Sequence, residues 1–387
     1  MDPLLGDCSL EVLRQRRSWK WMRFPPDVIP AWLAEMDFDL AEPVKEAVRA
    51  VISSSDAGYS RPQPDGFGEA YAAFAAQQWC WAPDPGRVFA VPDVMTGIAE
   101  VLYATTPHGS GVVLSPPIYP PFFFRLRLAN RKIIEAPMRR HAGGRYQLDP
   151  QAIDAALARP DAAAYLLCSP HNPTGRVWSR DDLTMVASLC DRHGAVLLVD
   201  EIHAPLALPG VRHIPFLSLG LDPDLARRTF TFTSASKGWN TPGLKCGLAV
   251  VERPEAAAVL AERWEALLPS HLGAQATIAA FRDGLPWLDA VRGQLDDNRA
   301  LTGKLLATHL PSVGYQPPEA SFLAWLDCTA LGLDDPVAHF LHRAKVAVNR
   351  GLDYGEPGRG FVRLNMGTSP DMLQEILRRM GSSIGAL

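Results

Sequence analysis

The chain has 387 residues, enough for two or three domains, and its 47% hydrophobic and 21% charged residues are ordinary for a globular protein. A formal net charge of −4 excludes a global field that would attract nucleic acid or an anionic membrane, and no apolar run approaches the roughly 18 residues of a membrane span. The six scattered cysteines lack metal-ligand spacing and no apolar leader follows the first residues, so we expect a cytoplasmic protein without a metal.

Residues 1–50 are punctuated by prolines and predict an N-terminal arm that forms part of a small domain. A basic cluster lies early in this arm, at Arg14, Arg16, Arg17 and Lys20. It could belong to a binding surface, but we favour a solvated helix face followed by an arm that packs on the body of the protein.

Residues 51–285 alternate short apolar runs with helical patterns and predict a large domain. Strands are expected at Val88–Val91, Gly111–Leu114, Lys132–Glu135, Ala164–Cys168, Ala195–Val199, Thr229–Thr233 and Gly247–Val251. Most of these runs lack polar alternation, as strands covered on both faces do. Helices are expected at Asp149–Ala158, after an Asp-Pro cap, and at Ser179–His193, where Asp182 completes a weak capping box. The pattern predicts an α/β fold with a mostly parallel seven-stranded sheet.

Residues 286–387 change pattern and predict a smaller C-terminal α/β domain. Its expected helices and strands are Asp296–His309, Val337–Arg343 and Asp371–Met380, and Phe322–Leu326, Val346–Val348 and Phe361–Leu364, respectively.

Polar residues follow three of the expected strands, at the sheet edge where ligands of open α/β folds bind. Asn172 stands in a proline-flanked loop and offers an amide to a ligand. Asp200 either pairs with a protonated ring nitrogen or serves as a helix cap or a structural ion-pair partner. Lys237 follows the hydroxyls of Ser234 and Ser236, which suit a phosphate, and a lysine with a depressed pKa can form a Schiff base with an aldehyde.

Two further cations are candidate ligand-binding residues. Lys245 offers a second positive charge for the phosphate. Arg363 lies inside a strand-like apolar run, where it either grips a carboxylate through two hydrogen bonds or forms an interdomain salt bridge.

In order and over nearly the whole chain, Asn172, Asp200, Lys237 and Arg363 resemble the fold type I superfamily of class I/II aminotransferases, which use pyridoxal 5'-phosphate (PLP). The resemblance implies that Lys237 holds the cofactor as a Schiff base, Asn172 binds its phenolic oxygen, Asp200 binds its pyridine nitrogen and Arg363 binds the substrate carboxylate.

The resemblance implies further contacts in the same site. Tyr119 would stack on one face of the cofactor ring and also contact substrate, as would Asn172, while Ile202 would press on the other face. His203 stands where many aminotransferases carry a tyrosine. Val94 and Met95 would give backbone N–H groups to the phosphate. The catalytic residues would be Lys237, Asp200 and Tyr119.

A narrower resemblance joins the chain to the MalY/PatB branch of cystathionine β-lyase-like C–S lyases. It rests on the segments Ala31–Phe38, Gly58-Tyr59, Pro116–Phe122 and Asp200–His203. It implies a β-elimination that converts a cystathionine-like thioether of L-cysteine into a thiol, pyruvate and ammonia. It also implies a homodimer with shared active sites, in which Tyr59 reaches the phosphate of the neighbouring subunit. Glu35, Ser169 and Ala320-Ser321 depart from the branch pattern and would reshape the substrate pocket.

Other outcomes of the same chemistry stay open. An aminotransferase shares the first half of the reaction, and a specialised biosynthetic PLP enzyme would use the same α-carbanion for replacement or carbon–carbon bond formation. A regulatory binding module is a further alternative, because some relatives of the branch also bind a transcription factor. Direct DNA binding is not expected, since the sequence has neither a helix-turn-helix pattern nor a basic face.

Overall fold

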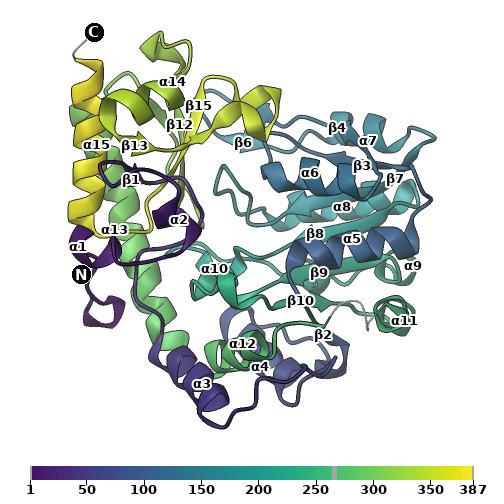
Figure 1. Ribbon diagram of the computed structural model, residues 1–387. Coiled ribbons are helices and arrows are strands. Elements are labelled where there is room, and N and C mark those ends of the chain that lie inside the picture. Colours follow the sequence, from purple (N-terminus) through teal and green to yellow (C-terminus); the bar gives the residue numbers. More distant parts are fainter. Residues whose placement is uncertain (1, 264–267, 386–387) are drawn as a thin grey trace.

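The computed structural model describes residues 2–263 and 268–385, and its largest element is a seven-stranded sheet (Figure 1). The strands lie in the order β2-β10-β9-β8-β7-β3-β4, and β10 alone runs antiparallel to its neighbours. Their bounds are β2 (Val88–Val91), β3 (Gly111–Leu114), β4 (Lys132–Glu135), β7 (Ala162–Cys168), β8 (Val196–Asp200), β9 (Thr229–Thr233) and β10 (Gly247–Val250). The predicted α/β fold with a mostly parallel sheet is confirmed.

Helices cover both faces of this sheet, because its central strands are apolar on both sides. Val112 and Leu166 belong to a buried cluster with α5 (Val94–Thr105), α6 (Pro120–Leu128) and α11 (Pro254–Glu262). Their neighbours Val113 and Leu167 belong to a second cluster with α7 (Pro150–Leu157) and α8 (Arg180–Arg192). Burial of both sets explains why the strands lack polar alternation.

The two helix starts expected from the sequence are present. Asp149 accepts hydrogen bonds from the backbone N–H groups of Gln151 and Ala152 at the start of α7. Ser179 and Asp182 form a reciprocal capping box at the start of α8. Each cap satisfies backbone donors that the helix itself leaves unpaired. Loss of one cap lowers the free energy of unfolding by about 1 kcal/mol.

The C-terminal part contains a four-stranded antiparallel sheet in the order β11-β12-β15-β14. Its strands are β11 (Gly314–Tyr315), β12 (Leu323–Asp327), β14 (Asn349–Arg350) and β15 (Phe361–Asn365). The long helix α13 (Leu285–His309) packs beside α15 (Pro370–Ile384), as Figure 1 shows.

The predicted start of α13 at Asp296 is wrong, because Pro286 occupies the first turn, where a missing N–H is harmless. The predicted helix Val337–Arg343 is a short α14 (Pro336–His339) followed by a π-helical turn (Phe340–Ala344).

The N-terminal arm packs on both parts of the chain. Its strand β1 (Ile29–Pro30) pairs with β13 (Val346–Ala347). Lys20 is buried and its Nζ lies 2.7 Å from Asp37 Oδ1 and 2.9 Å from the Glu35 carbonyl oxygen. The interpretation of the early basic cluster as a solvated helix face is therefore wrong for Lys20, which forms a buried ion pair with Asp37 inside the arm.

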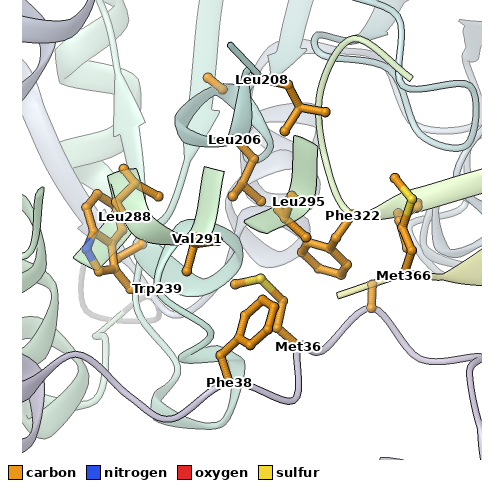
Figure 2. Close-up of a cluster of buried hydrophobic side chains, with 14 of the residues drawn as sticks. Met36, Phe38, Leu206, Leu208, Trp239, Leu288, Val291, Leu295, Phe322 and Met366 are labelled. Carbon is orange, nitrogen blue, oxygen red and sulfur yellow. The ribbon is translucent and has the colours of Figure 1, made fainter. Parts of the chain in front are cut away.

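The remaining α-helices and strands have the following bounds. They are α1 (Leu10–Leu13), α2 (Trp19–Met22), α3 (Glu42–Ser53), α4 (Phe67–Trp79), α9 (Pro223–Ala226), α10 (Ala235–Gly238), α12 (His271–Asp283) and the hairpin β5 (Arg139–Arg140) and β6 (Tyr146–Gln147). Figure 2 shows an apolar cluster in which Met36 and Phe38 of the arm meet Trp239, Val291 and Phe322. This cluster fixes the arm beside α10. Within the described ranges, no helix has the length and apolar character needed to cross a membrane.

Candidate active site

A cleft of about 430 Å³ opens at the carboxyl ends of β7, β8 and β9 and at the start of α5. This volume is suitable for a small-molecule site. Of the predicted site residues, those that line the cleft are Val94, Met95, Tyr119, Asn172, Asp200, Ile202, His203, Ser234, Ser236, Lys237 and Lys245. Arg363 and Tyr59 are not among the lining residues, but Arg363 donates a hydrogen bond to Asn172, which is.

Lys237 projects from α10, directly after β9, and its Nζ donates a hydrogen bond to the Ala34 carbonyl oxygen at 2.8 Å. Burial, with a smaller contribution from the positive charge of Arg363, lowers the pKa of Lys237 to about 8. A lowered pKa increases the fraction of neutral amine at physiological pH. The neutral amine is the form that attacks a carbonyl carbon.

Asp200 is the last residue of β8 and is buried. Its Oδ1 accepts a hydrogen bond from the Ile202 N–H at 2.9 Å, yet burial raises the pKa of Asp200 to about 7. Within residues 2–263 and 268–385, no cation forms an ion pair with Asp200, which argues against the structural ion-pair alternative. A cationic ring nitrogen of a ligand would stabilise this carboxylate.

From the raised pKa of Asp200 we predict how the stability of the folded protein depends on pH. The folded-state pKa lies above the ordinary 3.8, so this group favours folding at low pH, and that contribution is lost as the pH rises through about 7. At pH 8 the ligand-free protein must bury a charge, at a cost on the order of a few kcal/mol. We therefore expect Asp200→Asn to melt at a higher temperature than the wild type at pH 8, and the difference to shrink at pH 5.

Thermal unfolding of protein stripped of small ligands measures this difference, with Asp181→Asn on the surface of α8 as the control. An equal difference in melting temperature at both pH values would contradict the assignment of a buried, unpaired carboxyl to Asp200.

Arg363 is buried on β15 and joins the two parts of the chain. Its Nη1 donates to Asn172 Oδ1 at 3.2 Å, and its Nη2 donates to Asn349 Oδ1 at 2.7 Å and to the Trp32 carbonyl oxygen at 2.9 Å. Its Nε has no partner among the described residues, and neither does its charge find a carboxylate there within ion-pair distance. The alternative of an interdomain salt bridge is therefore wrong for the described chain. A buried guanidinium without a carboxylate fits a ligand that brings one.

Three of the predicted residues in the lining carry no charge. Tyr119 precedes the first turn of α6, and burial raises the pKa of its hydroxyl to about 12, so it stays protonated. Ile202 lines the same cleft. Burial also holds the pKa of His203 well below its usual value, so this imidazole is neutral, and its ring lies edge-on to Phe322 at 6.2 Å.

The start of α5 forms the end of the cleft predicted for the phosphate. Val94 and Met95 open the helix after Asp93, whose Oδ2 lies 3.3 Å from Lys245 Nζ. The Ser234 hydroxyl donates to the Cys246 carbonyl oxygen at 2.7 Å, so its proton is already used. Ser234 is therefore committed to the local fold as well as lining the cleft.

Several residues of the lining could not be singled out from the sequence, and Arg125 is the one cation among them. Arg125 on α6 lines the cleft, and its Nη2 donates to Thr96 Oγ1 of α5 at 2.9 Å. In the sequence, Arg125 and Arg127 look alike, because each is an arginine between two apolar residues. Only the packing of α6 against α5 separates them.

Tyr59 does not line the cleft of its own chain. Its side chain is 95% exposed. The position leaves it free to contact another molecule. Among the described residues, no group of three or more His, Cys, Asp or Glu side chains could hold a metal ion.

The chain is similar to known proteins over nearly its whole length. Residues 33–380 match the family model for class I and II aminotransferases. A Mycobacterium leprae protein named "Putative cystathionine beta-lyase" is 42% identical, with 98% of each chain covered. Cystathionine beta-lyase PatB of Bacillus subtilis is 34% identical over 92% of this chain and 93% of its own. The crystal structure of cystalysin from Treponema denticola, which contains pyridoxal 5'-phosphate, superposes with a TM-score of 0.92 at 26% identity, with 98% of this chain and 99% of that chain covered.

Proposed function

Because the chain belongs to the family of class I and II aminotransferases, we propose that it is a PLP-dependent C–S β-lyase. It converts a cystathionine-like thioether of L-cysteine into a thiol, pyruvate and ammonia. Relatives named as cystathionine β-lyases at 34–43% identity support the lyase reaction. The observation that carries the proposal is the cleft itself, which brings an amine of lowered pKa, Lys237, together with a buried carboxyl, Asp200.

The residues of the cleft fit PLP. Asp200 is buried and has no ion-pair partner among the described residues, and the protonated ring nitrogen of the cofactor would supply one. Lys237 would hold the cofactor covalently, and the Asn172 amide would bind its phenolic oxygen. Tyr119 and Ile202 would enclose the ring, since both line the cleft.

Bound PLP supplies the electron sink that allows an amino acid to lose its α-proton. Lys237 Nζ then accepts that proton and returns one to the leaving sulfur, and a pKa near the working pH suits both transfers. Arg363 holds the substrate carboxylate with its unpaired guanidinium. Asp200 would keep the ring nitrogen of the bound cofactor protonated. The unsaturated amine that is released hydrolyses in water to pyruvate and ammonia.

The products separate a lyase from an aminotransferase. The PLP-loaded protein is incubated with L-cystathionine, with and without an added 2-oxo acid, and thiol and pyruvate are quantified together. The proposal requires equal amounts of thiol and pyruvate without the 2-oxo acid. Turnover that needs the 2-oxo acid and releases no thiol would instead establish an aminotransferase.

We further propose that the chain forms a homodimer in which Tyr59 completes the cleft of the neighbouring subunit. The support is the 95% exposure of Tyr59 and the 60% exposure of Phe124, an aromatic residue at the cleft rim. Mixed dimers test this arrangement. Lys237→Ala and Tyr59→Ala subunits together rebuild one unaltered site if Tyr59 acts across the interface, and we expect pyruvate formation at PLP concentrations where neither variant alone is active. Mixed dimers that stay inactive would show that Tyr59 does not act in trans.

A reducing cytoplasm is the proposed location. All six cysteines are free thiols, and five of them are buried. Unpaired cysteines are usual in a reducing compartment.

A further inference from the structure

We propose that Arg125 supplies the positive charge that binds the cofactor phosphate in this protein. The inference rests on the proposed function only in taking PLP as the cofactor, and it does not depend on which reaction follows. It assigns a role to a residue that neither the sequence motifs nor the family resemblance identified.

Arg125 is placed at the phosphate end by a direct bond to α5. Its Nη2 donates to Thr96 Oγ1 at 2.9 Å, and Thr96 follows Met95 in the first turn of the helix. Thr96 Oγ1 in turn donates to Asp93 Oδ1 at 3.0 Å. Arg125 is half-buried and lines the cleft together with Val94 and Met95. The guanidinium and the first N–H groups of α5 therefore belong to the same end of the cleft.

The charges at this end leave Arg125 as the unpaired cation. Lys245, the cation expected from the sequence, is 63% exposed and lies 3.3 Å from the Asp93 carboxylate, so the two charges offset each other. The start of a helix contributes about half a positive charge, whereas a phosphate monoester carries about −1.5 to −2 at neutral pH. Within the described ranges Arg125 has no carboxylate partner, and its charge is available to balance the phosphate.

The form of the side chain suits this role. A guanidinium has five N–H donors in a fixed plane. The bond to Thr96 uses one of them and holds the plane against α5, so the others are oriented before the ligand arrives. The Ser234 hydroxyl already donates to Cys246, so the guanidinium adds donors that this serine does not offer to a ligand.

The test compares two ligands that differ only in the phosphate. Apo protein is titrated with PLP and with pyridoxal, and the visible absorbance of the lysine-bound ligand gives each dissociation constant. The variants are Arg125→Gln, which removes the charge, and Arg125→Lys, which keeps it without the planar fork. The matched control is Arg127→Gln, because Arg127 is an exposed arginine two positions further along α6.

We expect Arg125→Gln to weaken PLP binding by roughly tenfold to a hundredfold, the usual effect of losing a charge-assisted hydrogen bond. Pyridoxal binding should stay at the wild-type value in the same variant. The PLP affinity of Arg125→Lys should lie between those of the wild type and of Arg125→Gln. Arg127→Gln should bind PLP and pyridoxal as the wild type does.

Three results would overturn the role of Arg125. The first is unchanged PLP affinity in Arg125→Gln. The second is an equal loss for PLP and pyridoxal, which would indicate a structural role through Thr96. The third is a higher KM for the thioether with unchanged PLP affinity, which would assign Arg125 to the substrate. The titrations contain no substrate, so tight PLP binding by a wild type that forms no pyruvate would contradict the lyase proposal alone.

Discussion

Lys237→Ala is expected to abolish turnover of L-cystathionine and to remove the visible absorbance of the bound cofactor. Lys237 brings to the cleft an amine whose pKa is lowered to about 8. Lys245, the other lysine of the lining, lies beside Asp93 and is 63% exposed. Loss of a general base alone costs about 10² to 10⁴ in rate. Because Lys237 is also the residue that we propose holds the cofactor, we expect a loss of about 10⁴-fold or more in kcat.

Pyruvate release and the absorbance spectrum measure the two effects of this variant separately. Lys132→Ala is the control, since this lysine is 63% exposed and pairs with Asp161 on the surface. A Lys237→Ala protein within tenfold of wild-type kcat would show that Lys237 neither binds the cofactor nor moves the proton.

Arg363→Gln is expected to give the second large loss, this time in kcat/KM. The guanidinium is held in place by Asn172, Asn349 and the Trp32 carbonyl, and it has no carboxylate partner in the described chain. Losing one partner of a buried charge pair costs about 2–5 kcal/mol. We therefore expect kcat/KM to fall by about 30- to 5,000-fold, mostly through KM.

Two further variants test this prediction: Arg363→Lys is the conservative replacement, and Arg359→Gln is the control. The lysine keeps the charge but loses the planar fork, so it should recover only part of the activity. Arg359 is exposed and pairs with Glu356, so its replacement should leave kcat/KM at the wild-type value. Wild-type kcat/KM in Arg363→Gln would show that the substrate carboxylate binds elsewhere. It would leave the role of Lys237 intact.

The sheet and the centre of the site could be predicted because they depend on local sequence. A strand that is buried on both faces is a short apolar run, and such runs locate β7, β8 and β9 within one or two residues. These three strands are parallel neighbours, so the residues that follow them must lie at the same edge. Asn172, Asp200 and Lys237 meet there for that reason.

What the sequence could not predict depends on tertiary packing. Arg125 and Arg127 have the same local character, and only the approach of α6 to α5 places Arg125 against Thr96. Lys20 belongs to a basic cluster that is usually solvated, yet the fold of the arm buries it against Asp37. The salt-bridge alternative for Arg363 could be excluded only when all its neighbours in the described chain were known.

The most direct test of the central claim is to fix the cofactor on the protein and find the residue that carries it. The PLP-loaded protein is reduced with borohydride, digested, and analysed by peptide mass mapping. We predict that the added mass of the reduced cofactor lies on the peptide containing Lys237. Recovery of the cofactor on another lysine, or a Lys237 peptide that is unmodified after complete loading, would contradict the account.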